Sequence, residues 1–155
     1  MTTAPYVAVV GPGEGATPAD LAAAREVGRL LAEGGAVLLT GGLGGVMAAA
    51  TDGAASAGGL TVALLPGTDR ARSAAAVVLP TGLGEVRNAL LVRAADAVLA
   101  VGGSWGTLSE IALARRTGVP VVCLGGWAVV GPDGTPLDLP RAGAPAEAVA
   151  LVLGH

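Results

Sequence analysis

Residues 97–115 read AVLAVGGSWGTLSEIALAR, an apolar run followed by a glycine loop and then a pattern typical of a helix. This order predicts a strand, a tight loop and the N-terminus of a helix. The first N–H groups of a helix have no partner inside it, and the helix dipole makes that end partly positive. Glycines let the loop backbone approach an anion closely. We therefore expect a phosphate group at this junction.

The rest of the chain repeats this alternation of short apolar runs and alanine-rich helical segments. We expect strands at Tyr6–Val10, Ala36–Thr40, Thr61–Leu65, Val77–Leu79, Ala97–Val101 and Val119–Leu124. We expect helices at Pro18–Glu33, Gly45–Ala57, Glu85–Ala95, Thr107–Thr117 and Pro145–Leu153. Strands joined by single helices form a parallel sheet through right-handed crossovers. The predicted fold is therefore α/β, a single Rossmann-like domain over residues 1–155, with a doubly wound parallel sheet and helices on both faces.

Four loops rich in glycine or proline follow these strands. They span Gly11–Gly15, Gly41–Gly45, Pro66–Asp69 and Gly102–Gly106. All four would meet at the carboxyl edge of the sheet, where ligands bind in such folds. One such loop is a weak indication, because tight turns need glycine anyway, but four at one edge favour a ligand site.

A dinucleotide-binding site fits this pattern poorly. The spacing of Gly11, Gly13 and Gly15 differs from G-x-G-x-x-G. The second strand ends in Thr40-Gly41, where an acidic residue would normally hold the ribose. We therefore do not expect NAD as the ligand.

The composition restricts the partners and the location. The chain is 52% hydrophobic and 14% charged, with a net charge of −3. Without a basic patch we expect no nucleic acid as partner. No apolar window reaches the roughly 18 to 20 residues of a membrane span, and Met1–Pro5 lacks the features of a secretory signal. We expect a cytoplasmic protein with a small ligand and no membrane partner.

The residue types that are missing exclude several kinds of chemistry. All nine cationic side chains are arginines, so a lysine Schiff base and the lysine of a P-loop are excluded. His155 is the one histidine, which argues against a catalytic triad, a Cys-His pair or a histidine zinc site, and we expect no metal. Cys123 lies within an apolar run, and we expect it in the core. Catalysis would rely on carboxylates, arginines, hydroxyls and backbone dipoles.

Two segments resemble signatures of the LOG family, whose members are cytokinin riboside 5′-monophosphate phosphoribohydrolases. Thr40–Met47 resembles G-G-G-x-x-G-L-M, with Thr40 in place of a glycine. Residues 102–110 resemble P-G-G-x-G-T-x-x-E, in which Gly106, Thr107 and Glu110 match.

The resemblance runs from about Val7 to Leu124. Arg87 matches the arginine of an R-K pair in the family, and Asn88 replaces its lysine. The sequence Gly102-Gly103-Ser104 replaces Pro-Gly-Gly. The short form of the chain is even more similar to a branch that includes molybdenum-cofactor carrier proteins, which bind a phosphorylated pterin.

The resemblance implies that Arg87 and Glu110 form a catalytic pair. Glu110 would stabilise positive charge on the ribose and orient or deprotonate water. Arg87 would bind the 5′-phosphate or the departing base. The other residues expected around the phosphate or ligand are Gly11, Gly13, Gly41, Gly42, Gly45, Met47, Pro66, Gly67, Asn88, Gly102, Gly103, Ser104, Trp105, Gly106 and Thr107.

Each of these side chains also has a structural alternative. Thr107 and Glu110 fit a T-x-x-E capping box, in which Glu110 would only close the N-terminus of the helix. Arg87 would be a solvated charge on a helix surface. Trp105 would contact either a ligand or a second subunit.

Two functions remain open at this point. As an enzyme, the protein would hydrolyse the N-glycosidic bond of a nucleoside 5′-monophosphate to free base and ribose 5-phosphate, without a cofactor. As a carrier, it would bind molybdenum cofactor or a nucleotide without turnover. Both take a small phosphorylated ligand. The apolar helices and the resemblance imply a homodimer or larger homo-oligomer.

Overall fold

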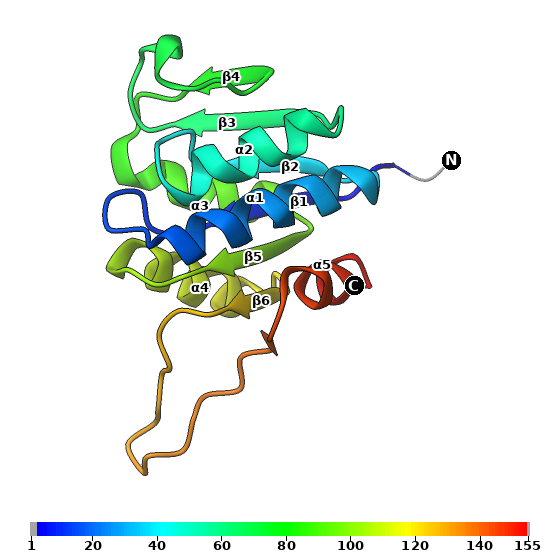
Figure 1. Ribbon diagram of the computed structural model, residues 1–155. Helices are drawn as coiled ribbons and strands as arrows, with labels where there is room; N and C mark the ends of the chain where they lie inside the picture. The colour runs from blue at the N-terminus through cyan, green and yellow to red at the C-terminus, as the bar shows by residue number, and fades with distance from the viewer. Residues whose placement is uncertain (1–2, 155) are drawn as a thin grey trace.

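The computed structural model describes residues 3–154 (Figure 1); Met1, Thr2 and His155 lie outside this range. The strands are β1 (Tyr6–Val10), β2 (Val37–Thr40), β3 (Thr61–Leu65), β4 (Val77–Pro80), β5 (Ala97–Val101), β6 (Val121–Leu124) and β7 (Arg141–Ala142). The α-helices are α1 (Pro18–Glu33), α2 (Val46–Ser56), α3 (Arg87–Ala94), α4 (Trp105–Thr117) and α5 (Pro145–Leu153). Two 3-10 helices lie at Arg70–Arg72 and Gly84–Val86.

The strands form one parallel sheet in the order β4-β3-β2-β1-β5-β6-β7. The chain builds outward from β1 to β4 and then returns to the other side of β1 with β5. The direction of winding therefore switches between β1 and β5, which is where doubly wound sheets bind ligands. The predicted α/β Rossmann-like fold is confirmed.

Helices cover both faces of the sheet. Helices α1, α2 and α5 pack together on one face, and α3 and α4 pack on the other (Figure 1). Each face has its own apolar cluster, because the buried strands point alternate residues to opposite sides. One cluster joins Val9 and Leu99 to α1, α2 and α5, and the second joins Ala8 and Val98 to α3 and α4. Cys123 is buried in the second cluster, as expected.

Helices α1 and α2 touch through their backbones. A Cβ at Gly28 would lie 2.0 Å from the carbonyl oxygen of Ala50, and a Cβ at Gly53 would lie 1.9 Å from that of Arg25. Only glycine fits at both crossing points, which brings the two helices close together.

The elements differ from the predicted bounds at a few ends. Helix α4 begins at Trp105, two residues before the predicted start, because Ser104 caps it. Residues 84–86 form a 3-10 turn, so α3 begins at Arg87 rather than at Glu85. Strand β6 begins at Val121, after Pro120, which has no N–H for a ladder. The short strand β7 was not predicted.

The segment between β6 and β7 projects from the body of the protein as a long arm (Figure 1). An isolated antiparallel bridge pairs Val130 with Pro136 within it. Arg141 fastens its base by donating hydrogen bonds to the carbonyl oxygens of Gly125 and Trp127. None of the helices described here is long and apolar enough to cross a membrane.

Candidate functional site

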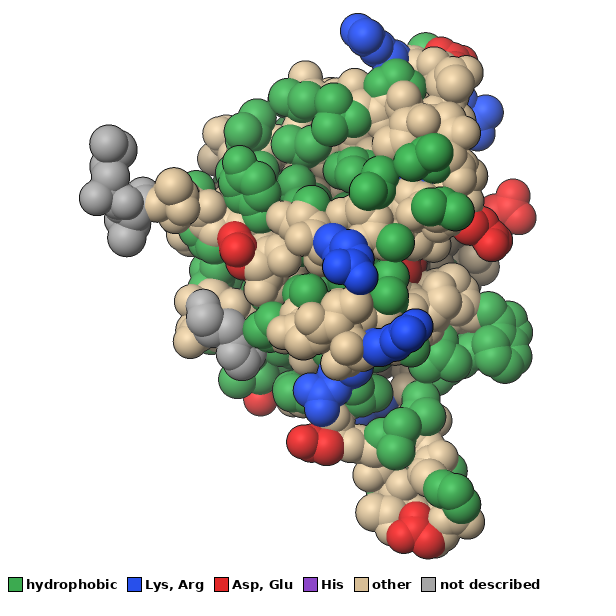
Figure 2. All heavy atoms as spheres, turned by 180° about the vertical axis from the view of Figure 1, so that it is seen from behind, with side chains coloured by type: hydrophobic (Ala, Val, Ile, Leu, Met, Phe, Trp, Pro, Cys, Tyr) green, Lys and Arg blue, Asp and Glu red, His purple; other side chains and the backbone are tan. Residues whose placement is uncertain are grey.

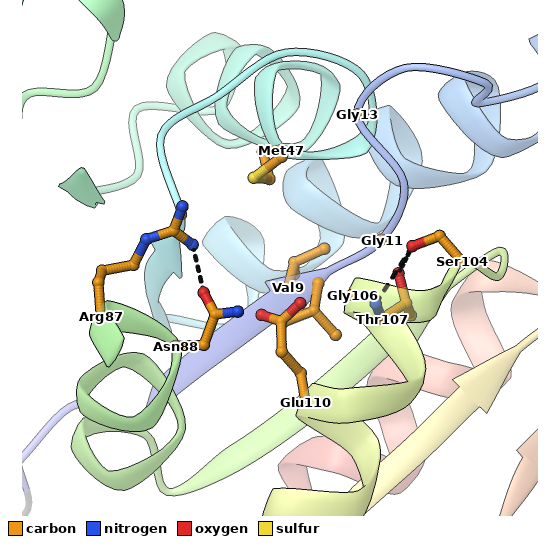
Figure 3. Close-up of a pocket in the computed structure, with 12 residues that line it drawn as sticks. Val9, Gly11, Gly13, Met47, Arg87, Asn88, Ser104, Gly106, Thr107 and Glu110 are labelled. Atoms are coloured by element: carbon orange, nitrogen blue, oxygen red, sulfur yellow. Dashed lines mark hydrogen bonds between the residues drawn. The ribbon is translucent and has the colours of Figure 1, made fainter. Parts of the chain in front are cut away.

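A pocket of about 190 Å³ lies at the carboxyl ends of β1 and β5 (Figure 3). It brings together three of the four predicted loops and the beginning of α3. Its lining consists of Val9, Val10, Gly11, Gly13, Gly41, Met47, Arg87, Asn88, Ser104, Gly106, Thr107 and Glu110. Val9 and Val10 were not predicted; they are the last residues of β1, and the position of a strand end at the switch point is the signal that identifies them.

The N-terminus of α4 forms one wall of the pocket. Ser104 is the N-cap, and its hydroxyl accepts a hydrogen bond of 3.2 Å from the Thr107 amide. The Ser104 and Thr107 hydroxyls also lie 2.9 Å apart, within hydrogen-bond distance. The amides of Trp105 and Gly106 belong to the first turn, where N–H groups have no partner inside the helix. This wall therefore offers amides, hydroxyls and a positive dipole end to an anion.

Glu110 does not close the helix. The capping-box alternative is wrong, because Thr107 lies inside α4 and receives the cap from Ser104. The Glu110 side chain instead points into the pocket from the second turn of α4 (Figure 3). Glu110 is only 8% exposed. Burial raises the pKa of its carboxyl to about 7, although the positive charge of Arg87 opposes this shift.

Arg87 begins α3 and lies on the other side of the pocket. The surface-charge alternative is wrong, because the residue is only 7% exposed. Its Nε is buried and has no hydrogen-bond partner within residues 3–154. Burial lowers the pKa of the guanidinium, and Glu110 partly offsets this effect. The described residues thus leave part of the hydrogen-bonding capacity of this buried guanidinium unused.

Two neighbours fix the position of the Arg87 guanidinium. Its Nη1 donates a hydrogen bond of 2.8 Å to Oδ1 of Asn88. It also lies so close to Gly41 that a Cβ at residue 41 would come within 2.4 Å of Nη1. That Cβ would also be 3.1 Å from Sδ of Met47, which lines the same side of the pocket.

Several of the predicted ligand residues build the loops without lining the pocket. Gly42 and Gly45 have positive φ, and a Cβ at Gly45 would lie 2.3 Å from the Gly13 carbonyl oxygen, so these glycines let two pocket loops touch. Gly102 has a positive φ, and Gly103 packs against Trp127.

Pro66 and Gly67 lie elsewhere. Their carbonyl oxygens accept hydrogen bonds from Gly84 and Gly82, so this loop supports the turn that leads into α3.

Trp105 lies outside the pocket. Its side chain is 78% exposed and packs edge-to-face against Trp127, with ring centroids 4.9 Å apart. It lines a neighbouring hollow of about 450 Å³ between α3 and α4. Asn88 and Gly106 border both this hollow and the pocket, so the two adjoin.

The fold and the site together define a Rossmann-like α/β protein with a pocket at the switch point of its sheet. Within this class, the chain belongs to the SLOG cluster4 family, whose family model matches residues 4–138. A relative from Archaeoglobus fulgidus, an uncharacterized protein, is 44% identical over 119 residues, which cover 76% of this chain and 78% of that one.

Two solved structures are similar over almost their whole length. The molybdenum cofactor binding protein of Rippkaea orientalis is 36% identical, with a TM-score of 0.88, and the match covers 99% of this chain and 98% of that one. The molybdenum cofactor carrier protein of Chlamydomonas reinhardtii is 34% identical, with a TM-score of 0.86, and the match covers 98% of both chains. These matches confirm the resemblance to the short branch of the LOG-like proteins.

Proposed function

We propose that this protein binds molybdenum cofactor, a phosphorylated pterin, and carries it without cleaving it. The observation that carries the proposal is the buried Arg87. No carboxylate of residues 3–154 forms an ion pair with it within 4.0 Å, and its Nε has no partner there. An anionic ligand in the pocket would supply the countercharge, which favours binding of the ligand over the empty state.

The phosphate group fits the wall formed by α4. The first-turn amides and the one hydroxyl proton that the Ser104–Thr107 pair leaves free offer hydrogen-bond donors there, and the helix dipole favours the negative charge. Arg87 faces this wall across the pocket (Figure 3). The two ends together suit a ligand with a phosphate at one end and polar atoms at the other.

The size of the site also suits such a ligand. Pockets for small organic ligands commonly measure roughly 300 to 1,000 Å³. The pocket of about 190 Å³ holds only part of a phosphorylated pterin, and the adjoining hollow of about 450 Å³ offers room for the rest. Trp105 borders that hollow and is the aromatic residue of its lining.

The relatives support a carrier rather than an enzyme. The two solved structures that match nearly the whole chain are a molybdenum cofactor binding protein and a molybdenum cofactor carrier protein. The chain also lacks the lysine of the family's R-K pair, with Asn88 in its place.

The test is whether the protein holds the cofactor when it is purified. Wild type would be purified without oxygen from cells that make the cofactor, and bound molybdenum and pterin would be quantified. We expect both in similar amounts, and a loss of about tenfold or more in Arg87→Met, because a charge-assisted contact is removed. Arg93→Met, on the same helix but exposed, should behave like wild type. Wild-type protein without pterin or molybdenum would contradict the proposal.

A second candidate is hydrolysis of a nucleoside 5′-monophosphate. The observation in its favour is that Arg87 and Glu110 line one pocket, and that the pKa of Glu110 is near 7, which suits a general acid or base. The test is release of free base from a panel of purine and pyrimidine monophosphates and a cytokinin riboside monophosphate. Release that is lost in Glu110→Gln would favour the enzyme, and no release from any substrate would exclude it.

A further inference from the structure

Asn88 is held in one orientation by its neighbour. The Oδ1 atom accepts the 2.8 Å hydrogen bond from Nη1 of Arg87. Since the amide has one oxygen and one nitrogen, this bond turns the NH₂ group the other way. Figure 3 shows that nitrogen on the side of the Glu110 carboxylate. Arg87 is thus a positioning residue for Asn88.

Asn88 and Glu110 present a row of hydrogen-bonding groups to the pocket. The Asn88 amide offers N–H donors, and the ionised Glu110 carboxylate offers two acceptor oxygens. Among the hydrogen bonds of the described residues, the one from Arg87 occupies Oδ1 of Asn88, and the Asn88 NH₂ group and the Glu110 carboxylate are left to a ligand. In the view of Figure 3, the Asn88 nitrogen and the two Glu110 oxygens follow one another, so the order is a donor and then two acceptors.

We infer that Asn88 and Glu110 together recognise the 2-amino-4-oxo edge of the ligand ring. The inference rests on the proposed function, in which the ligand is a phosphorylated pterin. That edge carries a carbonyl oxygen, a ring N–H and an amino group, so it offers an acceptor followed by two donors. Asn88 would donate to the carbonyl, and Glu110 would accept from the ring N–H and the amino group.

The same row discriminates between purine rings. Guanine has the same acceptor-donor-donor edge as a pterin. Adenine has an amino donor where guanine has its carbonyl, and a ring acceptor beside it. Its amino group would therefore meet the donor of Asn88, and its ring nitrogen would meet an acceptor oxygen of Glu110. A site built to hydrogen-bond one pattern rejects the other because buried polar groups are left unpaired.

Asn88 stands where the LOG family signature has a lysine, and this replacement suits the proposed recognition of the ring edge. A lysine at residue 88 would add a second cation next to Arg87 and would offer donors on a flexible stem. Asn88 instead accepts from Arg87 with one atom and donates with the other. A rigid, neutral amide suits the recognition of a planar ring edge.

The first test uses wild-type protein alone, so it does not depend on the folding of any variant. Affinities would be measured by calorimetry for 6-hydroxymethylpterin phosphate, GMP, AMP and ribose 5-phosphate. We expect the pterin phosphate and GMP to bind at least about tenfold more tightly than AMP, which corresponds to one unpaired buried group. Equal affinities for GMP and AMP would overturn the inference.

The second test uses variants. Glu110→Gln should weaken binding of the pterin phosphate and GMP by about tenfold or more, because Gln replaces one acceptor with a donor. It should not weaken binding of ribose 5-phosphate, which has no ring edge and loses only the repulsion of a carboxylate. Asn88→Asp should act in the same direction by placing an acceptor opposite the carbonyl. Asp138→Asn, an exposed residue in the arm, is the control for loss of one charge.

The outcomes separate the inference from the proposed function. Tight binding of the pterin phosphate with unchanged affinity in Glu110→Gln and Asn88→Asp would overturn the edge recognition and leave the carrier function standing. No binding of the pterin phosphate by wild type would overturn both.

Discussion

Gly41 and Arg87 are in close contact, so that a Cβ at residue 41 would lie only 2.4 Å from Nη1 of the arginine. The contact is with the end of a flexible side chain. Gly41→Ala should therefore displace the guanidinium from its place in the pocket at little cost in stability. It should also break the hydrogen bond that orients Asn88.

We predict that Gly41→Ala weakens ligand binding by about tenfold, because one charge-assisted hydrogen bond is worth roughly 1.5 to 3 kcal/mol. The measurement is calorimetric titration with the pterin phosphate, beside a thermal melt. Gly44→Ala is the matched control, since it lies in the same loop and has open space around its Cβ position. Equal affinities for the two variants would contradict the prediction.

Removal of the Arg87 charge should not destabilise the empty protein. A buried charge without an ion-pair partner is costly to the folded state, and an apolar side chain of similar length removes this cost. Denaturation by urea should therefore give Arg87→Met an unfolding free energy equal to or above that of wild type. The exposed control Arg93→Met should change it by less than about 0.5 kcal/mol. A clear loss of stability in Arg87→Met alone would show that Arg87 supports the fold.

Stability should fall as the pH rises toward 7. Because the pKa of Glu110 is raised from 4.5 to about 7 in the folded protein, the native state binds more protons than the unfolded state between these values. The contribution of the Glu110 carboxyl to the unfolding free energy is therefore fully present below pH 4.5. It is lost as the pH rises through 7, and the loss is on the order of 3 kcal/mol. Urea denaturation at pH 5 and pH 8 measures the difference. Glu110→Gln should reduce it, and an equal difference in both proteins would assign it to other groups.

Ligand binding should respond to pH through the same carboxyl. The ring edge needs the ionised form of Glu110, so the pterin phosphate should bind more tightly as the pH rises through 7. Sulfate, which keeps its charge over this range, should show the opposite trend, because the ionised carboxylate repels it. Titrations at pH 6 and pH 8 test this, and parallel trends for both ligands would contradict it.

We predict that the protein forms a homodimer or larger assembly through the face that carries α3 and β4. Leu79, Leu83, Val86 and Leu90 are exposed there, with Val86 at 65%. Figure 2 shows hydrophobic side chains gathered on this side of the molecule. Light scattering after gel filtration should report a multiple of the chain mass for wild type and a smaller particle for Val86→Asp. Leu151→Asp, on the opposite helical layer, should leave the assembly unchanged.

The alternation of apolar runs and glycine loops predicted the fold well, because strands buried on both faces read as continuous apolar segments. Three of the seven strands and two of the five helices have the predicted bounds. The predicted bounds are wrong where a single residue determines at which position a helix or strand begins or ends. Ser104 and Thr107 can both cap a helix, and the sequence does not reveal which hydroxyl meets the amide.

The site was harder to predict than the fold. The loops after β1, β2 and β5 meet as expected, but the burial of Arg87 depends on the contact with Gly41, which lies 46 positions earlier in the chain. No local pattern distinguishes a buried arginine from an exposed one. The orientation of Asn88 likewise depends on a hydrogen bond that only the folded α3 creates.

The contact between the backbones of α1 and α2 has a mechanical consequence. Gly28 and Gly53 leave no layer of side chains between the helices, so the two helices form one stiff support. The loop before α1 and the loop before α2 contact each other at Gly13 and Gly45, and each leads directly into one of these two helices. The two loops on this side of the pocket are therefore held in a fixed position relative to each other. A side chain added at Gly28, in the middle of α1, would tilt that side of the pocket and misplace both loops at once.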